Sequence, residues 1–266
     1  MLKSFSYCMD LISKTIVGHH NKVAYISLEI GRRMDLSDLK LKKLVVSALM
    51  HDLGIFYVRK FSNTNMDVIA ADEKFNNSLY DLNFFKTFLN LDFNDSRIKN
   101  HAEIGYQLFK DKPPINEIPE IIRYHHHDWE ENDDSEILIL SNILHLADRI
   151  AVLIEEDSPI LTQRKRIKKI IRKNQELHFF SEAVRKFINL VSQDFFWFNI
   201  NNFNYIVKIL DNFFQPPMKL INDEEILKFS KVISHLVDFR SSFTATHSAG
   251  VSGISSHLSK YLNFSK

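Results

Sequence analysis

The sequence predicts an all-α protein built as a helical bundle. In nearly every long segment, apolar residues recur every three or four positions, which is the spacing of an amphipathic helix. Only six glycines and six prolines occur in 266 residues, too few for the frequent turns of a β-sandwich or β-barrel. The sequence also has no glycine-rich phosphate-binding loop of the Rossmann or Walker type. Its chemistry is therefore expected on side chains that several helices bring together.

Two helices are predicted close to the N-terminus. The first has its apolar positions at Val23, Ile26, Ile30 and Met34. Ser37 is suited to cap a second helix, because a serine hydroxyl can accept a hydrogen bond from the first helical turn. The second helix is predicted to continue through an apolar stretch and to end at Gly54, since glycine is common just after a helix.

Further helices are predicted by the same periodicity over residues 97–110, 119–126, 137–154, 167–173, 183–191 and 205–214. Pro113 and Pro114 stop the first of these, and Pro119 is suited to the first turn of the next. The segment 137–154 is apolar enough to lie at the centre of the bundle. Residues 75–94 are rich in Phe and Asn and are predicted to form a helix with loops.

The best boundary between structural units follows Gln215, where two prolines stand together. A helix is predicted to resume over 224–237, and a short repeat comes after it. His247 precedes Val251 by four residues, as His19 precedes Val23. The register continues, so that Val251, Ile254 and Leu258 match Val23, Ile26 and Ile30. We therefore interpret residues 216–266 as the start of an incomplete second copy of the unit in residues 1–215.

Charge and cysteine content exclude several classes of protein. With 34 basic and 33 acidic residues, the net charge of +1 favours neither a nucleic-acid polymer nor a membrane as partner. The basic run at 164–169 has helical spacing and is interpreted as a solvated helix face. The single cysteine, Cys8, cannot form an internal disulfide, and no signal peptide or membrane anchor is recognised. We expect a soluble cytoplasmic protein.

Histidine and aspartate residues are grouped in a way that favours a metal site. The groups are His19–His20, His51–Asp52, His101, His125–His127 and Asp148. Imidazole and carboxylate donors together suit Zn, Fe or Mn, and the lack of a second cysteine excludes a structural thiolate site. The carboxylate of Asp52 could bridge two metal ions, which would then share and acidify one water molecule.

Each group also has a simpler interpretation. An isolated His-Asp dipeptide such as His51–Asp52 occurs on the surface of many proteins without any special role. Residues 125–127 could be the polar end of a helix. Asp148 lies on an apolar helix, where a buried carboxylate needs either a metal or a hydrogen-bond partner. His145, one turn earlier, is interpreted as a packing or supporting histidine rather than a ligand.

The order and spacing of these groups resemble the HD superfamily of metal-dependent phosphohydrolases, and within it the HD-GYP type. The matching ligand positions are His19, His51, Asp52, His101, His125, His126 and Asp148. The resemblance covers roughly residues 15–155 and includes Gly105, four residues after His101, and Trp129 at a position that is often aromatic.

This resemblance implies a specific fold and chemistry. The fold would be an HD-type helical bundle whose central metal site holds two or three divalent transition-metal ions, with Fe or Mn favoured. The reaction would be hydrolysis of a phosphoester bond in a nucleotide or cyclic dinucleotide, as in a cyclic di-GMP phosphodiesterase. Asp52 would be the catalytic residue, because it would bridge the metals and orient the attacking water.

The sequence departs from the family pattern where substrate is recognised. Ile55 stands where the family has a lysine that contacts phosphate, and isoleucine cannot make that contact. His127 replaces a glutamate, and the acidic residues 130–135 replace the loop that contains Gly-Tyr-Pro. Residues 238–248 resemble the start of a second HD domain, as in tandem members of the group.

Two further hypotheses therefore stand beside the enzyme. The chain could be a catalytically weak, metal-holding regulatory or signalling module of a tandem HD protein, because the lysine and the Gly-Tyr-Pro loop are missing. It could also be a ligand-binding signalling scaffold without metal. A second HD domain, or a second copy of this chain in a homodimer, would be the protein partner expected of such modules.

Overall fold

The structure is a computed structural model, described over residues 18–54, 96–110, 118–130, 134–215, 222–224, 226, 230 and 242–264. Every regular element within these residues is an α-helix, which confirms the predicted all-α class. None of the described helices is long and apolar enough to cross a membrane.

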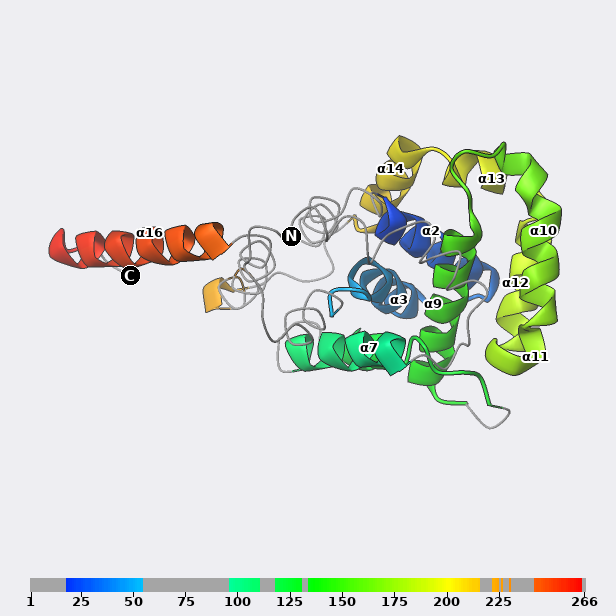
Figure 1. Ribbon diagram of the computed structural model, residues 1–266, viewed down its shortest axis with the longest axis horizontal. Coiled ribbons are helices and arrows are strands. Elements are labelled where there is room, and N and C mark those ends of the chain that lie inside the picture. Colours follow the sequence, from blue (N-terminus) through cyan, green and yellow to red (C-terminus); the bar gives the residue numbers. More distant parts are fainter. Residues whose placement is uncertain are drawn as a thin grey trace.

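Helix α2 (His19–Arg33) lies at the centre of the bundle (Figure 1). It packs against α3 (Asp38–Met50) and α9 (Glu136–Leu153) on one side, and against α12 (Ser181–Leu190) and α14 (Phe203–Phe213) on the other. This double coverage explains why Val23, Ile26 and Ile30, the residues that predicted the helix, are fully buried. Helix α9 is likewise buried along most of its length, as its apolar composition predicted.

Two further layers complete the described bundle. Helices α7 (Ser96–Phe109) and α8 (Ile118–Arg123) pack on each other, and α8 packs on α3 and α9. On the opposite side, α10 (Ile160–Lys173), α11 (Gln175–His178) and α13 (Asp194–Ile200) join α12 and α14. In α10 only Gln163, Ile167 and Ile171 are buried, so the basic run on this helix is a solvated face, as predicted.

Several helix boundaries differ from the sequence prediction. Helix α3 ends at Met50 rather than at Gly54, and α8 ends at Arg123 rather than at residue 126. The histidines predicted on these helix ends therefore lie in turns. Helix α10 begins seven residues before the predicted 167, at Ile160, and the short helices α11 and α13 were not predicted at all. The predicted helix at 75–94 and the Pro216–Pro217 break lie outside the described residues.

The last described helix is α16 (Ser242–Tyr261), which Figure 1 draws apart from the bundle. Its apolar positions are exposed, including Val251 at 49%, Ile254 at 64% and Leu258 at 55%. These residues match Val23, Ile26 and Ile30 in register, yet the latter are buried completely. The same pattern thus has a full set of packing partners in α2 and lacks them among the described neighbours of α16.

Candidate metal centre

Asp52 lies between two groups of histidines, and each of its carboxylate oxygens faces a different group. Oδ2 is 3.1 Å from His51 Nε2 and 3.9 Å from His19 Nε2. Oδ1 is 3.3 Å from His101 Nε2. We name the two sets the first group, which consists of His19, His51 and Asp52, and the second group, which consists of His101, His125 and His126. Within each group the donor atoms lie within 4.8 Å of one another, as ligands of one metal ion must.

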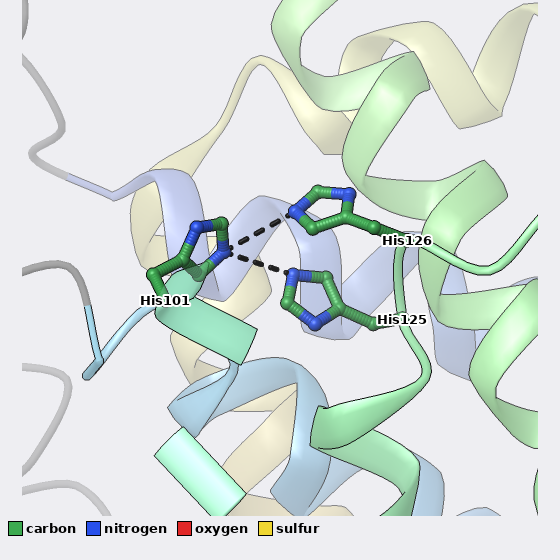
Figure 2. Close-up of side chains that lie close together, drawn as sticks. All are labelled: His101, His125 and His126. Atoms are coloured by element: carbon green, nitrogen blue, oxygen red, sulfur yellow. Dashed lines mark hydrogen bonds between the residues drawn. The ribbon is translucent and has the colours of Figure 1, made fainter. Parts of the chain in front are cut away.

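The second group is made only of imidazoles (Figure 2). His101 Nε2 lies 3.3 Å from His125 Nε2 and 3.2 Å from His126 Nε2. A neutral imidazole has one donor and one acceptor nitrogen, so three mutually close ring nitrogens cannot all be satisfied by one another. A divalent cation would accept a lone pair from each of them, which makes this arrangement suited to a metal.

Asp148 joins the first group from helix α9. Its Oδ1 lies 3.1 Å from His19 Nε2 and 3.6 Å from His51 Nε2. Histidines from α2 and from the turn after α3 are therefore partners of this buried carboxylate. All seven positions named from the sequence converge on one site, although they come from five separate segments of the chain.

The early ends of α3 and α8 fix which ring nitrogen faces the site. His51 Nδ1 lies 2.9 Å from the carbonyl of Ala48, and His125 Nδ1 lies 2.5 Å from the carbonyl of Ile122. The last carbonyls of a helix lack intrahelical partners, and a carbonyl only accepts, so both Nδ1 atoms donate. Each Nε2 atom is then directed at the site, as in metal sites whose ligand histidines are oriented by backbone carbonyls.

Two glycines allow the turn after α3 to reach helix α7. A Cβ atom on Gly54 would lie 1.9 Å from the carbonyl oxygen of His101 and 2.7 Å from the backbone nitrogen of Gly105. A Cβ on Gly105 would lie 2.9 Å from Ile122 Cγ2 and 3.8 Å from the carbonyl oxygen of His51. The absence of both side chains brings His101 within reach of Asp52, so these glycines position the site.

Burial and mutual charge set the protonation of the site. Burial, and then the neighbouring histidines, lower the pKa of His20 and of His125 to about 3, so both are neutral at pH 7. Burial alone would also lower the pKa of His51, but the carboxylates of Asp52 and Asp148 outweigh it and raise the pKa to about 10. Despite burial, the pKa values of these two carboxyls stay well below their usual range, because histidines surround them.

The donor set fits a divalent transition metal. His126 Nδ1 is buried and makes no hydrogen bond, and neither ring nitrogen of His20 has a hydrogen-bond partner. Buried polar atoms without partners are uncommon in folded proteins and call for an explanation such as a bound ion. Metal binding would replace the proton on His51, since metals bind the deprotonated ligand, and it would give a partner to the ring nitrogens that face the site.

The contacts that hold the segment after His126 were not predicted from the sequence. His178 Nδ1 lies 2.7 Å from Asp128 Oδ1. The amide of Asn142 donates to the carbonyls of His127 and His178 and accepts from Phe180 N. Trp129 also stacks on Phe180, with ring centroids 4.4 Å apart. These contacts fasten residues 127–129 to the α11–α12 corner. Most of these partners lie 36 to 51 residues apart along the chain, beyond the reach of any local sequence pattern.

His145 is buried and packs beside the second group. Its ring centroid lies 5.7 Å from that of His126, and its Nε2 accepts from Arg149 Nε at 3.5 Å. His145 contacts no carboxylate oxygen that would place it in either group, in keeping with the packing role interpreted from the sequence. Ile55 lies outside the described residues, so its position relative to the site is not described.

Comparison with known proteins identifies the family of this chain. A family model described as the HD domain matches residues 16–153. The 3′3′-cGAMP-specific phosphodiesterase 1 of Vibrio cholerae is 24% identical, over 96% of this chain and 56% of the relative. The solved V. cholerae cyclic GMP-AMP-specific phosphodiesterase V-cGAP3 has a TM-score of 0.65 and 16% identity. The match covers 100% of this chain and 66% of that one, and at this identity it shows the fold alone.

This chain therefore spans little more than half the length of its curated relative and just under two thirds of the solved chain. The HD-domain match itself covers more than half of the present chain and includes every residue of the two histidine groups and Asp148. The chain belongs to the HD-domain family.

Proposed function

We propose that this protein is a metal-dependent phosphodiesterase that hydrolyses a cyclic dinucleotide. The observation that carries the proposal is the position of Asp52, whose two oxygens face separate histidine groups. A carboxylate in this position is suited to bridging two metal ions. Two-metal sites are a recurrent solution for phosphoester hydrolysis, because they hold both the attacking and the leaving oxygen.

The chain's own residues have distinct roles in this mechanism. Two divalent ions, when bound, would acidify a water molecule and neutralise charge on the phosphoryl oxygens. Asp52 would hold the two ions together and orient the attacking water. His19, His51 and Asp148 would bind the ion beside Oδ2, and the second group would bind the ion beside Oδ1. The carbonyls of Ala48 and Ile122 keep the Nε2 atoms of His51 and His125 directed inward.

The ligand types favour Fe or Mn as the metal. The proposed set has five imidazoles and two carboxylates and no thiolate, a mixture that suits Fe, Mn and Zn rather than soft ions. Carboxylate donors also suit harder divalent ions such as Mn²⁺. We therefore propose two ions of Fe or Mn per chain.

The relatives support a cyclic dinucleotide as substrate, and they shift the choice within that class. The curated V. cholerae relative is specific for 3′3′-cGAMP, whereas the resemblance of the sequence to HD-GYP proteins pointed to cyclic di-GMP. We therefore propose 3′3′-cGAMP, rather than cyclic di-GMP, as the better substrate.

A catalytically weak regulatory module is the second candidate. It is favoured by Ile55 and by the exposed apolar positions of α16, which match the buried ones of α2. We propose that residues 216–266 begin a second HD-type unit whose packing partners are helices like α3 and α9. In that arrangement the second unit could carry part or all of the activity.

One experiment separates the two candidates. Purified protein loaded with Mn²⁺ or, under anaerobic conditions, with Fe²⁺ is incubated with 3′3′-cGAMP, with cyclic di-GMP and with a generic aryl phosphodiester. The phosphodiesterase proposal expects metal-dependent hydrolysis of 3′3′-cGAMP that Asp52→Asn abolishes. Bound metal without hydrolysis of any of the three substrates would favour the regulatory module instead.

A further inference from the structure

His20 is a buried histidine that neither the predicted ligand set nor the mechanism above uses. Its side chain is fully buried, yet Nδ1 and Nε2 both lack a hydrogen-bond partner. Most buried side-chain nitrogens in proteins have at least one partner, so an imidazole with none is unusual. A role limited to packing would leave two buried polar atoms unsatisfied at a position where an apolar side chain would fill the same space.

The location of His20 points to the first group. Its Nε2 lies 3.8 Å from Asp52 Oδ2, as near as the Nε2 of His19 at 3.9 Å. Its ring centroid lies 5.4 Å from that of His19 and 5.3 Å from that of His51. Three imidazoles thus surround one carboxylate oxygen.

The start of helix α2 explains how two consecutive residues reach the same site. Gly18 has a left-handed backbone conformation, with φ of 78°, and the helix begins directly after it. Consecutive helical side chains point about 100° apart, so the site must lie between the directions of His19 and His20. The two rings meet edge to face, with an angle of 81° between their planes. Each ring therefore presents its Nε2 to Asp52 from a different side.

We propose that His20 is a further ligand of the metal ion held by the first group, binding through Nε2. This inference rests on the proposed two-metal function and adds a residue to it. The ion beside Asp52 Oδ2 would then be bound by His19, His20, His51, Asp52 and Asp148. This would make the first group richer in ligands than the second group, and we expect it to bind metal more tightly when His20 is present.

The test compares metal binding with stability in the metal-free protein. His20→Leu removes both nitrogens and keeps an apolar side chain of similar size, whereas His20→Gln keeps a donor oxygen on a flexible chain. His145→Leu is the matched control, because His145 is equally buried but contacts no carboxylate of the site. For each protein, Mn²⁺ affinity is measured by calorimetric titration, and the melting temperature is measured with and without Mn²⁺.

We expect His20→Leu to weaken the binding of one of the two Mn²⁺ ions by at least about 10–100-fold, the loss typical of supporting residues. The metal-free melting temperature should not fall, since no hydrogen bond of His20 is lost. His20→Gln should bind Mn²⁺ with an intermediate affinity, and His145→Leu should bind it as the wild type does.

Three results would overturn the inference. The first is an unchanged affinity for both ions in His20→Leu. The second is a metal-free melting temperature that falls as far as the metal-bound one, which would identify a packing role. The third result applies if His20→Leu does not fold, and it is an unchanged affinity of His20→Gln for both Mn²⁺ ions. A wild-type protein that binds no Mn²⁺ or Fe²⁺ would instead refute the proposed function itself.

Discussion

Substitution of Gly54 by alanine should detach helix α7 from the metal centre. The new Cβ would lie 1.9 Å from the carbonyl oxygen of His101, and ordinary contacts of a Cβ begin near 3.4 Å. The backbones must therefore separate by about 1.5 Å, because a close-packed interior offers no free space. Helix α7 is the element expected to move, since it packs mainly on α8, whereas the turn of Gly54 follows α3, which packs on α2, α8 and α9.

This displacement would remove His101 from the second group. In the wild type, His101 Nε2 is 3.3 Å from Asp52 Oδ1 and 3.2 Å from His126 Nε2. Metal–histidine bonds are about 2.0–2.1 Å long and tolerate changes of only about 0.2 Å. We expect Gly54→Ala to lose about one metal ion per chain. Overpacking typically costs about 1–3 kcal/mol, and this contact with backbone should cost about 3 kcal/mol.

Two other glycines supply a graded control. A Cβ on Gly250 would have nothing within 4 Å, so Gly250→Ala should change neither metal content nor stability appreciably. A Cβ on Gly105 would meet the Cγ2 methyl of Ile122 at 2.9 Å, a milder clash than the backbone contact at Gly54, so Gly105→Ala should have an intermediate effect. Metal content is measured by plasma mass spectrometry and stability by urea unfolding. Wild-type metal content and stability in Gly54→Ala would refute the close approach of α7.

The remaining predictions concern turnover and pH. The unaltered protein should hydrolyse cyclic di-GMP weakly or undetectably, and Ile55→Lys should raise that rate in a product assay, because one lost charge-stabilising donor costs about 10²–10³ in rate. Robust turnover of cyclic di-GMP by the wild type would contradict this account of Ile55. In metal-free protein, the unfolding free energy should fall as pH drops below about 6.5, the unperturbed histidine pKa. The pKa of His20 and of His125 is about 3 in the folded protein, so the unfolded chain binds more protons in this range. Each such histidine contributes a slope of up to about 1.4 kcal/mol per pH unit. His51 has the opposite effect, because its pKa is raised to about 10 in the folded protein. Protonated His51 stabilises the fold fully below pH 6.5, and this contribution is lost as pH rises toward 10. Urea unfolding of chelator-treated protein should therefore show a stability maximum near pH 6.5, and a maximum above pH 8 would contradict these assignments.

The helical core could be predicted from sequence because its apolar periodicity is strong. Most of the apolar positions that predicted helices α2 and α9 are buried in the structure. The predicted bounds of α7 differ from the observed ones by one residue at each end. The helix ends at the metal centre could not be predicted in this way. Where these helices end, the Nδ1 atoms of His51 and His125 each hydrogen-bond to a carbonyl three residues earlier, a contact that periodicity does not report.

The candidate site was predictable in its ligand types and order, but not in its arrangement. The sequence placed Asp52 beside His51, yet only the fold shows that its two oxygens face different histidine groups. His20 was passed over because its neighbour His19 matched the family pattern. Its full burial and its distance to Asp52 depend on how α2 meets the turn after α3. The role of Gly54 likewise emerges only from its approach to α7.

The central claim is that Asp52 bridges two metal ions held by the two histidine groups. Anomalous diffraction from crystals of the Mn²⁺- or Fe²⁺-loaded protein tests it most directly. The account predicts two anomalous peaks, each about 2.0–2.2 Å from a different oxygen of Asp52, with His101, His125 and His126 around the peak at Oδ1. A single peak on one oxygen, or metal that does not contact Asp52 at all, would contradict it.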